Sequence, residues 1–405
     1  MTEVELPMHV ALVHMRSARV GGTESYLNQV ARHLCEHGHD VTIVCRSHED
    51  APHPKVRFVV LRALVPGSAL RILAFARDVE RHVRDHAYDL VVGLGRTWSQ
   101  DVLRVSGGCH ATYLALAHES SSHGWARWLD ALSPKHRVIL SIEAKALASD
   151  TLRCVIVNSE LVRRDLLQRY RIDPERVRLI RNGVDLARFH PRQRAEGGRK
   201  LREELRLGAG PVVLFLGSNY GRKGLGVVLE AFPELRRHFP SAKLVVVGAD
   251  PDIAGWKRRA HDLGLDDAAL FLGKRSDTEA CYGASDVYVL PTRYDSFAYT
   301  VLEALASGVP AIVSDAAGAS EVIDASCGAV LPATAGAAEV AGALRAWAAP
   351  ARRDAAAVAS RLVAEANGAE AAAERTVALF EELVRSSGAR GSPAARRASA
   401  NPPSR

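Results

Sequence analysis

The chain has 405 residues, of which 47% are hydrophobic and 24% charged, and its formal net charge is +7 at pH 7. This length and apolar content allow a large buried core divided between two domains. Residues 386–405 hold four arginines and no acidic residue, and this Ser-, Ala- and Pro-rich tail is expected to be disordered. The remainder is modestly basic, which suits an anionic ligand or an acidic membrane surface and excludes a dedicated DNA-binding protein.

Cysteine spacing and apolar segment length narrow the protein class further. The six cysteines show no Cys-x-x-Cys spacing, so neither a zinc ribbon nor a redox pair is indicated. The first residues are acidic and precede no long apolar stretch, and no segment approaches membrane-spanning length. We therefore expect a cytoplasmic, soluble protein that is at most peripheral to the inner face of the cell membrane.

The first half alternates short apolar segments with helical segments, which is the pattern of an open, mostly parallel sheet. The expected strands are His9–His14, Val41–Cys45, Val56–Leu61, Leu90–Gly93, Val138–Ser141, Val155–Asn158 and Val177–Ile180. The segment Val138–Ser141 also fits a helix. Residues 1–190 are therefore predicted to form an N-terminal, Rossmann-like domain.

The same alternation restarts after residues 191–200, a segment of Pro, Gly and charge that is the predicted linker. The expected strands of the second half are Val212–Gly217, Lys243–Gly248, Ala269–Gly273, Val287–Leu290, Ala311–Ser314 and Ala329–Leu331. Residues 201–365 are predicted to form a second Rossmann-like domain, and residues 366–385 a helix that returns to the first. Such an α/β chain places a cleft between its domains, and ligands bind outside the carboxyl ends of the strands.

The most informative segment runs from Pro291 to Gly308. An apolar strand ends in a loop that carries Asp295, and Glu303 follows about a turn and a half into the next helix. The first amides of that helix belong to Ala298, Tyr299 and Thr300. Free amides at a helix N-terminus favour an anion, and a carboxylate at Glu303 can accept hydrogen bonds from vicinal hydroxyls such as those of a ribose. The segment therefore predicts a sugar-nucleotide site.

A second cationic element follows the strand at Val212–Gly217. Arg222 and Lys223 lie between two glycines at a strand-to-helix turn, where the backbone can approach a diphosphate closely while two cations neutralise it. Solvated loop charges are the alternative interpretation. The loop that carries Lys274 and Arg275 follows another expected strand and is predicted to cover the base of the nucleotide.

These motifs, with several others, resemble those of one enzyme family. The residues that carry the resemblance are Asn158-Ser159, Asn182-Gly183-Val184-Asp185, Phe189, Gly221-Arg222-Lys223-Gly224, Asp295, Glu303 and Gly318-Ala319-Ser320-Glu321. Together they resemble glycosyltransferase family 4, whose members are retaining enzymes with the GT-B fold. The resemblance covers nearly the whole chain except the tail. Within the family, the segments 217–224 and 101–114 look most like the lipopolysaccharide core glucosyltransferases, which add glucose to inner-core heptose.

The resemblance implies an activity and a set of site residues. It implies transfer of a hexose, with UDP-glucose as the favoured donor, to a glycan or lipid-linked oligosaccharide acceptor such as the lipopolysaccharide core or another cell-envelope glycan, without a cofactor. The implied catalytic residues are Asp295, Arg222, Lys223 and His110. The loop at Gly21 and Gly22 would cover the donor phosphates from the opposite domain and shape the acceptor side, which the resemblance assigns to residues 1–190. The family usually has Glu where this chain has Asp295, and the shorter side chain bears on which donor sugar is bound.

The resemblance also implies a route for the reaction. Attack would occur on the same face as the leaving group, and the leaving phosphate would take the acceptor proton. Asp250-Pro251-Asp252 has the form of a metal-binding motif, but no further ligand is recognisable nearby, so no catalytic metal is predicted. His110 is predicted to contact the reacting sugar, with a structural histidine as the alternative.

Two further questions stay open at this point. Trp125, Trp128, Leu129 and Leu132 share one helical face near Arg127 and the basic run Lys135, His136 and Arg137. This pattern fits either insertion into an anionic membrane surface or an ordinary amphipathic helix facing its own core. The function classes that compete with a glycosyltransferase are a nucleotide-sugar epimerase of the same architecture and a nucleotide-sugar-binding protein without turnover.

Overall fold

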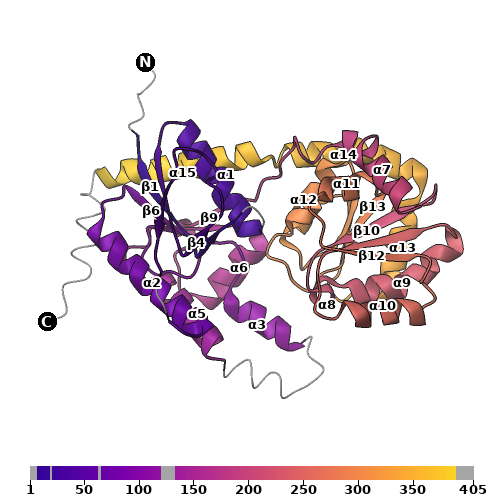
Figure 1. The fold of residues 1–405 in the computed structure, drawn as a ribbon, viewed down its shortest axis with the longest axis horizontal. Helices are drawn as coiled ribbons and strands as arrows, with labels where there is room; N and C mark the ends of the chain where they lie inside the picture. Colours follow the sequence, from indigo (N-terminus) through magenta and orange to yellow (C-terminus); the bar gives the residue numbers. More distant parts are fainter. Residues whose placement is uncertain (1–6, 19–20, 63–64, 120–132, 389–405) are drawn as a thin grey trace. The chain divides into compact units, whose positions relative to one another are not determined.

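The computed structural model describes residues 7–18, 21–62, 65–119 and 133–388, and these form two compact α/β units (Figure 1). Unit 1 contains the described residues up to Arg181 together with those from Glu370 onward. Unit 2 runs from Asn182 to Ala369. Each unit has a parallel sheet with helices on both faces, which confirms the predicted pair of Rossmann-like domains.

Unit 1 is built on a seven-stranded parallel sheet in the order β5-β3-β1-β6-β7-β8-β9. Its strands are β1 (His9–Val13), β3 (Asp40–Cys45), β5 (Arg57–Val60), β6 (Leu90–Gly93), β7 (Val102–Val105), β8 (Cys154–Val157) and β9 (Val177–Leu179), and β2 (Arg16–Ser17) pairs separately with β4 (Ser47–His48). Most residues of the main strands are apolar because both faces of the sheet are covered. In β1, Val10 and Leu12 pack into one hydrophobic cluster and Ala11 and Val13 into another.

The helices of unit 1 cover these two faces in separate groups. They are α1 (Gly22–Glu36), α2 (Ser68–Asp85), α3 (His110–Glu119), α5 (Pro134–Leu147), α6 (Glu160–Arg169), the 3-10 turn η1 (Pro174–Arg176) and α15 (Ala369–Gly388). Helices α1 and α15 contribute to the cluster that holds Val10 and Leu12, while α2, α5 and α6 pack on the opposite face (Figure 1). The sheet is thereby buried on both sides.

Two sequence-based expectations for unit 1 differ from the structure. The segment Val138–Ser141, expected as a strand, lies inside α5, where Ile139 and Ile142 are buried three residues apart on one helical face. The strand β7 was not among the expected strands, and one of its four residues is the charged Arg104. Arg104 is nevertheless only 1% exposed, and its guanidinium lies 3.6 Å from the centroid of the Tyr26 ring.

Unit 2 repeats the architecture with a six-stranded parallel sheet in the order β12-β11-β10-β13-β14-β15. Its strands are β10 (Val212–Leu216), β11 (Lys243–Val247), β12 (Ala269–Gly273), β13 (Val287–Leu290), β14 (Ala311–Ser314) and β15 (Gly328–Leu331). Its helical segments are η2 (Pro191–Arg194), α7 (Gly197–Glu204), α8 (Tyr220–Lys223), α9 (Leu225–His238), α10 (Ile253–Asp262), α11 (Thr278–Gly283), α12 (Tyr299–Ala306), η3 (Gly318–Val322), α13 (Ala337–Ala348) and α14 (Pro350–Glu365). All six strands expected for this half are present.

The boundaries between the units differ from those expected. Residues 191–200, expected as a linker, form η2 and the first half of α7 inside unit 2, where Arg194 pairs at 2.5 Å with the buried carboxylate of Asp286. The division falls instead between Arg181 and Asn182 and again between Ala369 and Glu370. Helix α15 therefore belongs almost entirely to unit 1.

Candidate functional site

The predicted donor site of unit 2 lies where the strand order reverses. Strand β10 pairs with β11 on one side and β13 on the other, and the loops after β10 and β13 both leave from carboxyl ends. The two loops meet directly. The Arg293 amide donates to the Arg222 carbonyl at 2.9 Å, and the Arg222 guanidinium donates to the Tyr294 carbonyl at 2.6 Å. The structure thus brings together two segments that are about 70 residues apart in the sequence.

One glycine makes this close approach feasible. Gly224 has φ +85°, and a Cβ at this position would lie 2.0 Å from the carbonyl oxygen of Pro291. No other residue fits there without moving one of the two loops. The short helix α8 that precedes Gly224 is capped by Asn219, whose side chain accepts from the Arg222 amide at 3.4 Å. The local sequence therefore fixes the position of Arg222 and Lys223.

Asp295 is held by its own loop and by Lys223. Its Oδ1 accepts from the amides of Phe297 at 3.1 Å and Ala298 at 2.8 Å, while Oδ2 forms an ion pair with Lys223. Burial raises the pKa of Asp295, but the charge and hydrogen bond of Lys223, the charge of Arg222 and the Phe297 amide outweigh it, so the pKa lies below its ordinary value. The carboxylate is ionised and already occupied on both oxygens.

This arrangement changes the expected use of the Ala298 amide. That amide was predicted to bind a phosphate, but it donates to Asp295. Ala298 itself precedes α12 in the left-handed region with φ +68°. Tyr299 and Thr300 form the first two positions of the helix, where backbone amides have no intrahelical acceptor. The Thr300 hydroxyl accepts from Tyr288 at 2.7 Å, which fixes the first turn of α12.

Glu303 lies one turn further along α12. The hydroxyl of Tyr282, a fully buried side chain, donates to Oε2 of Glu303 at 2.8 Å. Oε1 accepts no hydrogen bond from the part of the chain that the structure describes. Burial raises the pKa of Glu303, against the Tyr282 hydrogen bond and the charge of Arg188. One oxygen is therefore anchored while the other remains available to a ligand.

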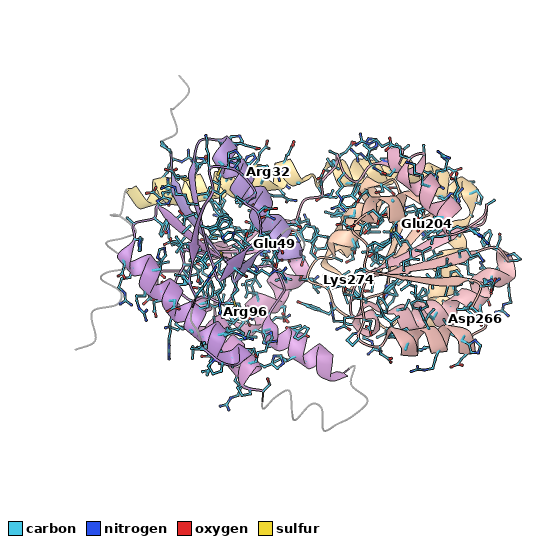
Figure 2. All side chains as sticks on the ribbon, in the orientation of Figure 1. Arg32, Glu49, Arg96, Glu204, Asp266 and Lys274 are labelled. Carbon is cyan, nitrogen blue, oxygen red and sulfur yellow. The ribbon has the colours of Figure 1, made fainter. Side chains whose placement is uncertain are left out.

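The two cations of the loop after β12 differ in their engagement. Arg275 donates to both carboxylate oxygens of Asp277, at 2.9 and 2.7 Å, and this pairing raises its pKa. Lys274 is exposed and has no ion-pair partner among the described residues (Figure 2). Of the two residues predicted to cover the nucleotide base, only Lys274 offers a cation that is not already neutralised.

The predicted glycine pair of unit 1 begins α1. Gly21 precedes the helix with φ +139°, and a Cβ there would lie 2.2 Å from a carboxylate oxygen of Glu24. Glu24 in turn lies 3.7 Å from the His14 imidazole, at the carboxyl end of β1. Gly22 is the first residue of α1. The pair therefore lies at the carboxyl edge of the unit 1 sheet.

His110 begins α3 and is fixed through both backbone and side chain. Its amide donates to the carboxylate of Glu143, with distances of 3.2 and 3.0 Å to the two oxygens. Its Nε2 lies 3.0 Å from Nδ1 of His136. Burial, followed by the charge of Arg96 and by the neighbouring His136, lowers the pKa of His110 to about 4. The imidazole is neutral at physiological pH and serves as a hydrogen-bonding group.

A cavity of about 410 Å³ opens beside His110 at the carboxyl edge of the unit 1 sheet. Arg96, Lys135 and Glu143 line it as well. Sequence reasoning missed Arg96 and Glu143. The available signal for Arg96 was its place directly after a glycine at the end of the buried strand β6.

The Asp-Pro-Asp segment after β11 has local structural roles. Asp250 accepts from the Tyr220 amide at 2.7 Å and the Asp252 amide at 3.0 Å, and Asp252 caps α10 by accepting from the Gly255 amide at 2.9 Å. Within the described ranges, no three His, Cys, Asp or Glu side chains gather into a metal-binding group. No helix in those ranges is both long and apolar enough to cross a membrane. Trp125 and Trp128 lie outside the described residues.

Family models match both halves of the chain. Residues 20–188 match the model described as Glycosyltransferase Family 4, and residues 210–349 match the model described as Glycosyl transferases group 1. Together the matches span most of the sequence and include both candidate sites.

Known proteins resemble the chain in sequence and in fold. It is 28% identical over 359 residues to the D-inositol 3-phosphate glycosyltransferase of Salinispora arenicola, covering 77% of this chain and 76% of that protein. It is 35% identical over 150 residues to a GDP-mannose-dependent alpha-(1-6)-phosphatidylinositol monomannoside mannosyltransferase of Mycobacterium tuberculosis, covering 35% and 38%. The structure of WaaG, a glycosyltransferase involved in lipopolysaccharide biosynthesis, matches with a TM-score of 0.78 and 21% identity, covering 92% of this chain and 99% of WaaG. The last likeness establishes a shared fold.

Proposed function

This chain belongs to glycosyltransferase family 4 and has the GT-B fold, and from that premise we propose that it transfers a hexose from a nucleoside-diphosphate sugar to a glycan acceptor with retention. We favour UDP-glucose as donor, and the lipopolysaccharide core or another cell-envelope glycan as acceptor. One observation carries the proposal. The switch point of the unit 2 sheet brings Arg222 and Lys223 to the first turn of α12. Glu303 lies one turn further along the same helix.

The first step of the argument concerns the diphosphate. Lys223 is 12% exposed and Asp295 15% exposed, so their ion pair is largely removed from water. A diphosphate at this position adds negative charge beside Lys223 and Arg222, and more charge develops on it as the bond to the sugar breaks. Preorganised cations stabilise that charge more strongly in the transition state than in the ground state. Lys223 would then share its charge between Asp295 and the leaving group.

The second step concerns the nucleoside. Glu303 presents Oε1 while Tyr282 holds Oε2, which suits a carboxylate that accepts from the two hydroxyls of a ribose. Lys274 would approach the base from the loop after β12. We keep these roles as proposals, together with contact between the neutral imidazole of His110 and the sugar that reacts.

The chemical step follows from the position of Asp295. A double displacement would need a carboxylate nucleophile beside the anomeric carbon. The carboxylate of Asp295 instead accepts from two amides and pairs with Lys223. We therefore propose that the acceptor oxygen bonds to the anomeric carbon on the face from which the diphosphate leaves. The bond between that carbon and the phosphate oxygen breaks, and the acceptor proton passes to the departing phosphate.

The decisive experiment follows a labelled donor with the purified chain. Binding of UDP-glucose, UDP-galactose and GDP-mannose is compared by calorimetry, and transfer from each is measured with cell-envelope glycan fractions. GDP-mannose is included because the name of one relative specifies it. We expect tightest binding of UDP-glucose and label in a glycan. An epimerised donor, or binding without product, would contradict the proposal.

We also propose turnover without bound metal, and loss of activity in EDTA that manganese or magnesium restores would overturn that part.

Membrane association remains a separate proposal. Lys135 and Arg137 are exposed at the start of α5, next to the undescribed segment with Trp125 and Trp128. Basic residues near an anionic bilayer each contribute on the order of 1 kcal/mol. Co-sedimentation with anionic but not neutral vesicles, weakened by salt, is the expected result for protein lacking residues 389–405.

A further inference from the structure

The cavity of unit 1 occupies the same topological position as the donor site of unit 2. His14 follows β1, residues 94–97 follow β6 and residues 106–108 follow β7, and all of them line the cavity. Strand β1 pairs with β3 on one side and β6 on the other, so the strand order reverses at this point. Ligands of open α/β sheets bind at such positions. With a volume of about 410 Å³, the cavity can hold a sugar-sized group with one charged substituent.

Arg96 is the central feature of this cavity. Figure 2 labels it on the part of unit 1 where α3 and α5 lie. Its side chain forms no hydrogen bond or ion pair with any residue that the structure describes, although it is partly buried. Burial lowers the pKa of the Arg96 guanidinium, and the charge of Glu143 offsets only part of this effect. A partly dehydrated cation without an ion-pair partner gains from an anionic ligand.

The backbone holds Arg96 in an uncommon conformation. Gly95 and Arg96 have φ values of +100° and +64°, so two consecutive residues lie in the left-handed region. The residues that follow are packed tightly. Thr97 is 1% and Trp98 7% exposed, and the ammonium of Lys145 lies 3.9 Å from the Trp98 ring centroid. Because the loop is anchored on this side, Arg96 keeps a strained conformation of the kind that clusters at binding sites.

The acidic residue of the cavity does not neutralise Arg96. Glu143 accepts from the His110 amide at 3.2 and 3.0 Å and from the Tyr170 hydroxyl at 2.6 Å. Its charge is therefore committed to the N-terminus of α3. Lys135 lies at the second position of α5 and lines the same cavity as an exposed cation. Arg104 also lines the cavity, but it is buried against the Tyr26 ring. The concave surface therefore offers a ligand the cations of Arg96 and Lys135 beside an occupied carboxylate.

We propose that this cavity is a phosphate-binding subsite in which Arg96 and Lys135 hold a phosphate group carried by the glycosyl acceptor. That the phosphate belongs to a glycosyl acceptor rests on the proposed function, whereas the binding of phosphate is argued from the cavity alone. A planar guanidinium forms paired hydrogen bonds to phosphate, and Lys135 adds a second positive charge. The neutral His110 at the cavity wall would then lie beside the acceptor rather than compete for its anion.

Arg96→Gly provides a test that does not depend on a damaged fold. Glycine adopts a φ of +64° without strain, so this variant should melt no lower than the natural chain while losing the cation. Arg32→Gln is the matched control, because Arg32 is an exposed arginine of α1 that does not line the cavity (Figure 2). Both changes are made in a Lys223→Gln background, which disables the other predicted phosphate site.

Inorganic phosphate is titrated at constant ionic strength and followed by phosphorus NMR. Arg96→Gly should weaken phosphate binding roughly tenfold or more, and Lys135→Gln should weaken it less, since a bidentate charged contact exceeds a single flexible one. Arg32→Gln should leave it unchanged. Equal phosphate affinity in Arg96→Gly and Arg32→Gln overturns the proposal, as does acetate that competes as well as phosphate.

UDP calorimetry separates this proposal from the proposed function. With Lys223 restored, Arg96→Gly should bind UDP normally and lose affinity only for phosphate. Normal UDP binding and sugar transfer together with undiminished phosphate binding would remove the subsite and leave the proposed function intact. If the chain binds phosphate through Arg96 but binds no nucleotide, the phosphate subsite stands and the proposed function is contradicted.

Discussion

At the scale of single residues, the ion pair of Lys223 with Asp295 links the stability of the fold to pH. Their ion pair is mostly buried, and the pKa of Asp295 lies below its ordinary value of 3.8. A carboxyl group with a lowered pKa stabilises the fold above that ordinary value, and the stabilisation is lost as pH falls through the folded pKa. The two charges therefore contribute to stability as well as to the proposed catalysis.

Lys223→Gln should reduce turnover by roughly 10²–10³, the usual effect of losing one preorganised electrostatic contact. It should also lower the melting temperature at neutral pH and reduce its fall between neutral and acidic pH, because Asp295 loses its partner. The double change Lys223→Gln and Asp295→Asn should lose less stability than the sum of the single changes. Lys257→Gln, an exposed lysine of α10, is the control. Near-normal turnover of Lys223→Gln would remove this residue from the site.

Glu303 gives the opposite sign of pH dependence. Burial raises its pKa above 4.5, so the stability that it contributes is fully present below pH 4.5 and is lost as pH rises through the folded pKa. The melting temperature of Glu303→Gln should therefore rise relative to that of the natural chain as the pH is changed from 4 to neutral. It should nevertheless bind UDP more weakly, because an amide accepts ribose hydrogen bonds less well than a carboxylate. Unchanged UDP affinity in calorimetry, with Glu203→Gln on the exposed face of α7 as control, would contradict the ribose assignment.

Local sequence located the donor-site residues but not their partners. A strand, a glycine turn and a helix start follow from neighbouring residues, so Arg222, Lys223 and Glu303 could be predicted from their spacing. The pairing of Lys223 with Asp295 joins residues far apart in the sequence, and the capture of the Ala298 amide by Asp295 depends on the loop conformation. Neither is visible in residue periodicity. Arg96 was missed because its significance lies in a φ angle and in the burial of its surroundings.

At the level of secondary structure, the approach of two loops depends on Gly224. Gly224→Ala combines a left-handed backbone with a Cβ placed 2.0 Å from the Pro291 carbonyl oxygen. Gly264→Ala is a matched control, since Gly264 has φ +68° and a Cβ there would meet no atom of the described residues within 4 Å, its chain neighbours aside. The control should lose about 1–2 kcal/mol of unfolding free energy from backbone strain alone. Gly224→Ala should lose more and also lose UDP binding, as measured by denaturant unfolding and calorimetry. Equal losses would show that the loops do not depend on this contact.

Packing between elements decides the conformation of the two segments that sequence analysis did not assign correctly. The segment Val138–Ser141, three apolar residues followed by a serine, fits a strand or one face of a helix, and only the packing of Ile139 and Ile142 decides between them. Strand β7, which was not predicted, contains the charged Arg104, and this side chain is buried against the Tyr26 ring. The all-apolar strands were predicted correctly because parallel sheets covered on both faces need no alternation.

At the scale of the whole molecule, the two similar halves follow from the repeated alternation of strands and helices, but the unit boundaries do not. The segment 191–200 is rich in charge and glycine, which indicates exposure rather than a domain border. Its Arg194 is used inside unit 2, where it pairs with Asp286 alongside Arg202, which lies just after the segment. The return of α15 to unit 1 depends on contacts with residues more than 200 positions earlier, such as that of Arg153 with Ser386.

That return makes unit 1 dependent on the C-terminal helix. Phe380 is fully buried in the same cluster as Leu12, and Val377 and Leu379 are 5% and 7% exposed. Loss of a single buried Phe typically costs about 3–5 kcal/mol, and a domain is stable by only about 5–15 kcal/mol. A chain that ends at Ala369 should therefore lose the unfolding transition of unit 1 in calorimetry while unit 2 still binds UDP. A chain that ends at Gly388 should keep both. A cooperative transition of unit 1 that survives removal of α15 would show that the helix is dispensable to that core.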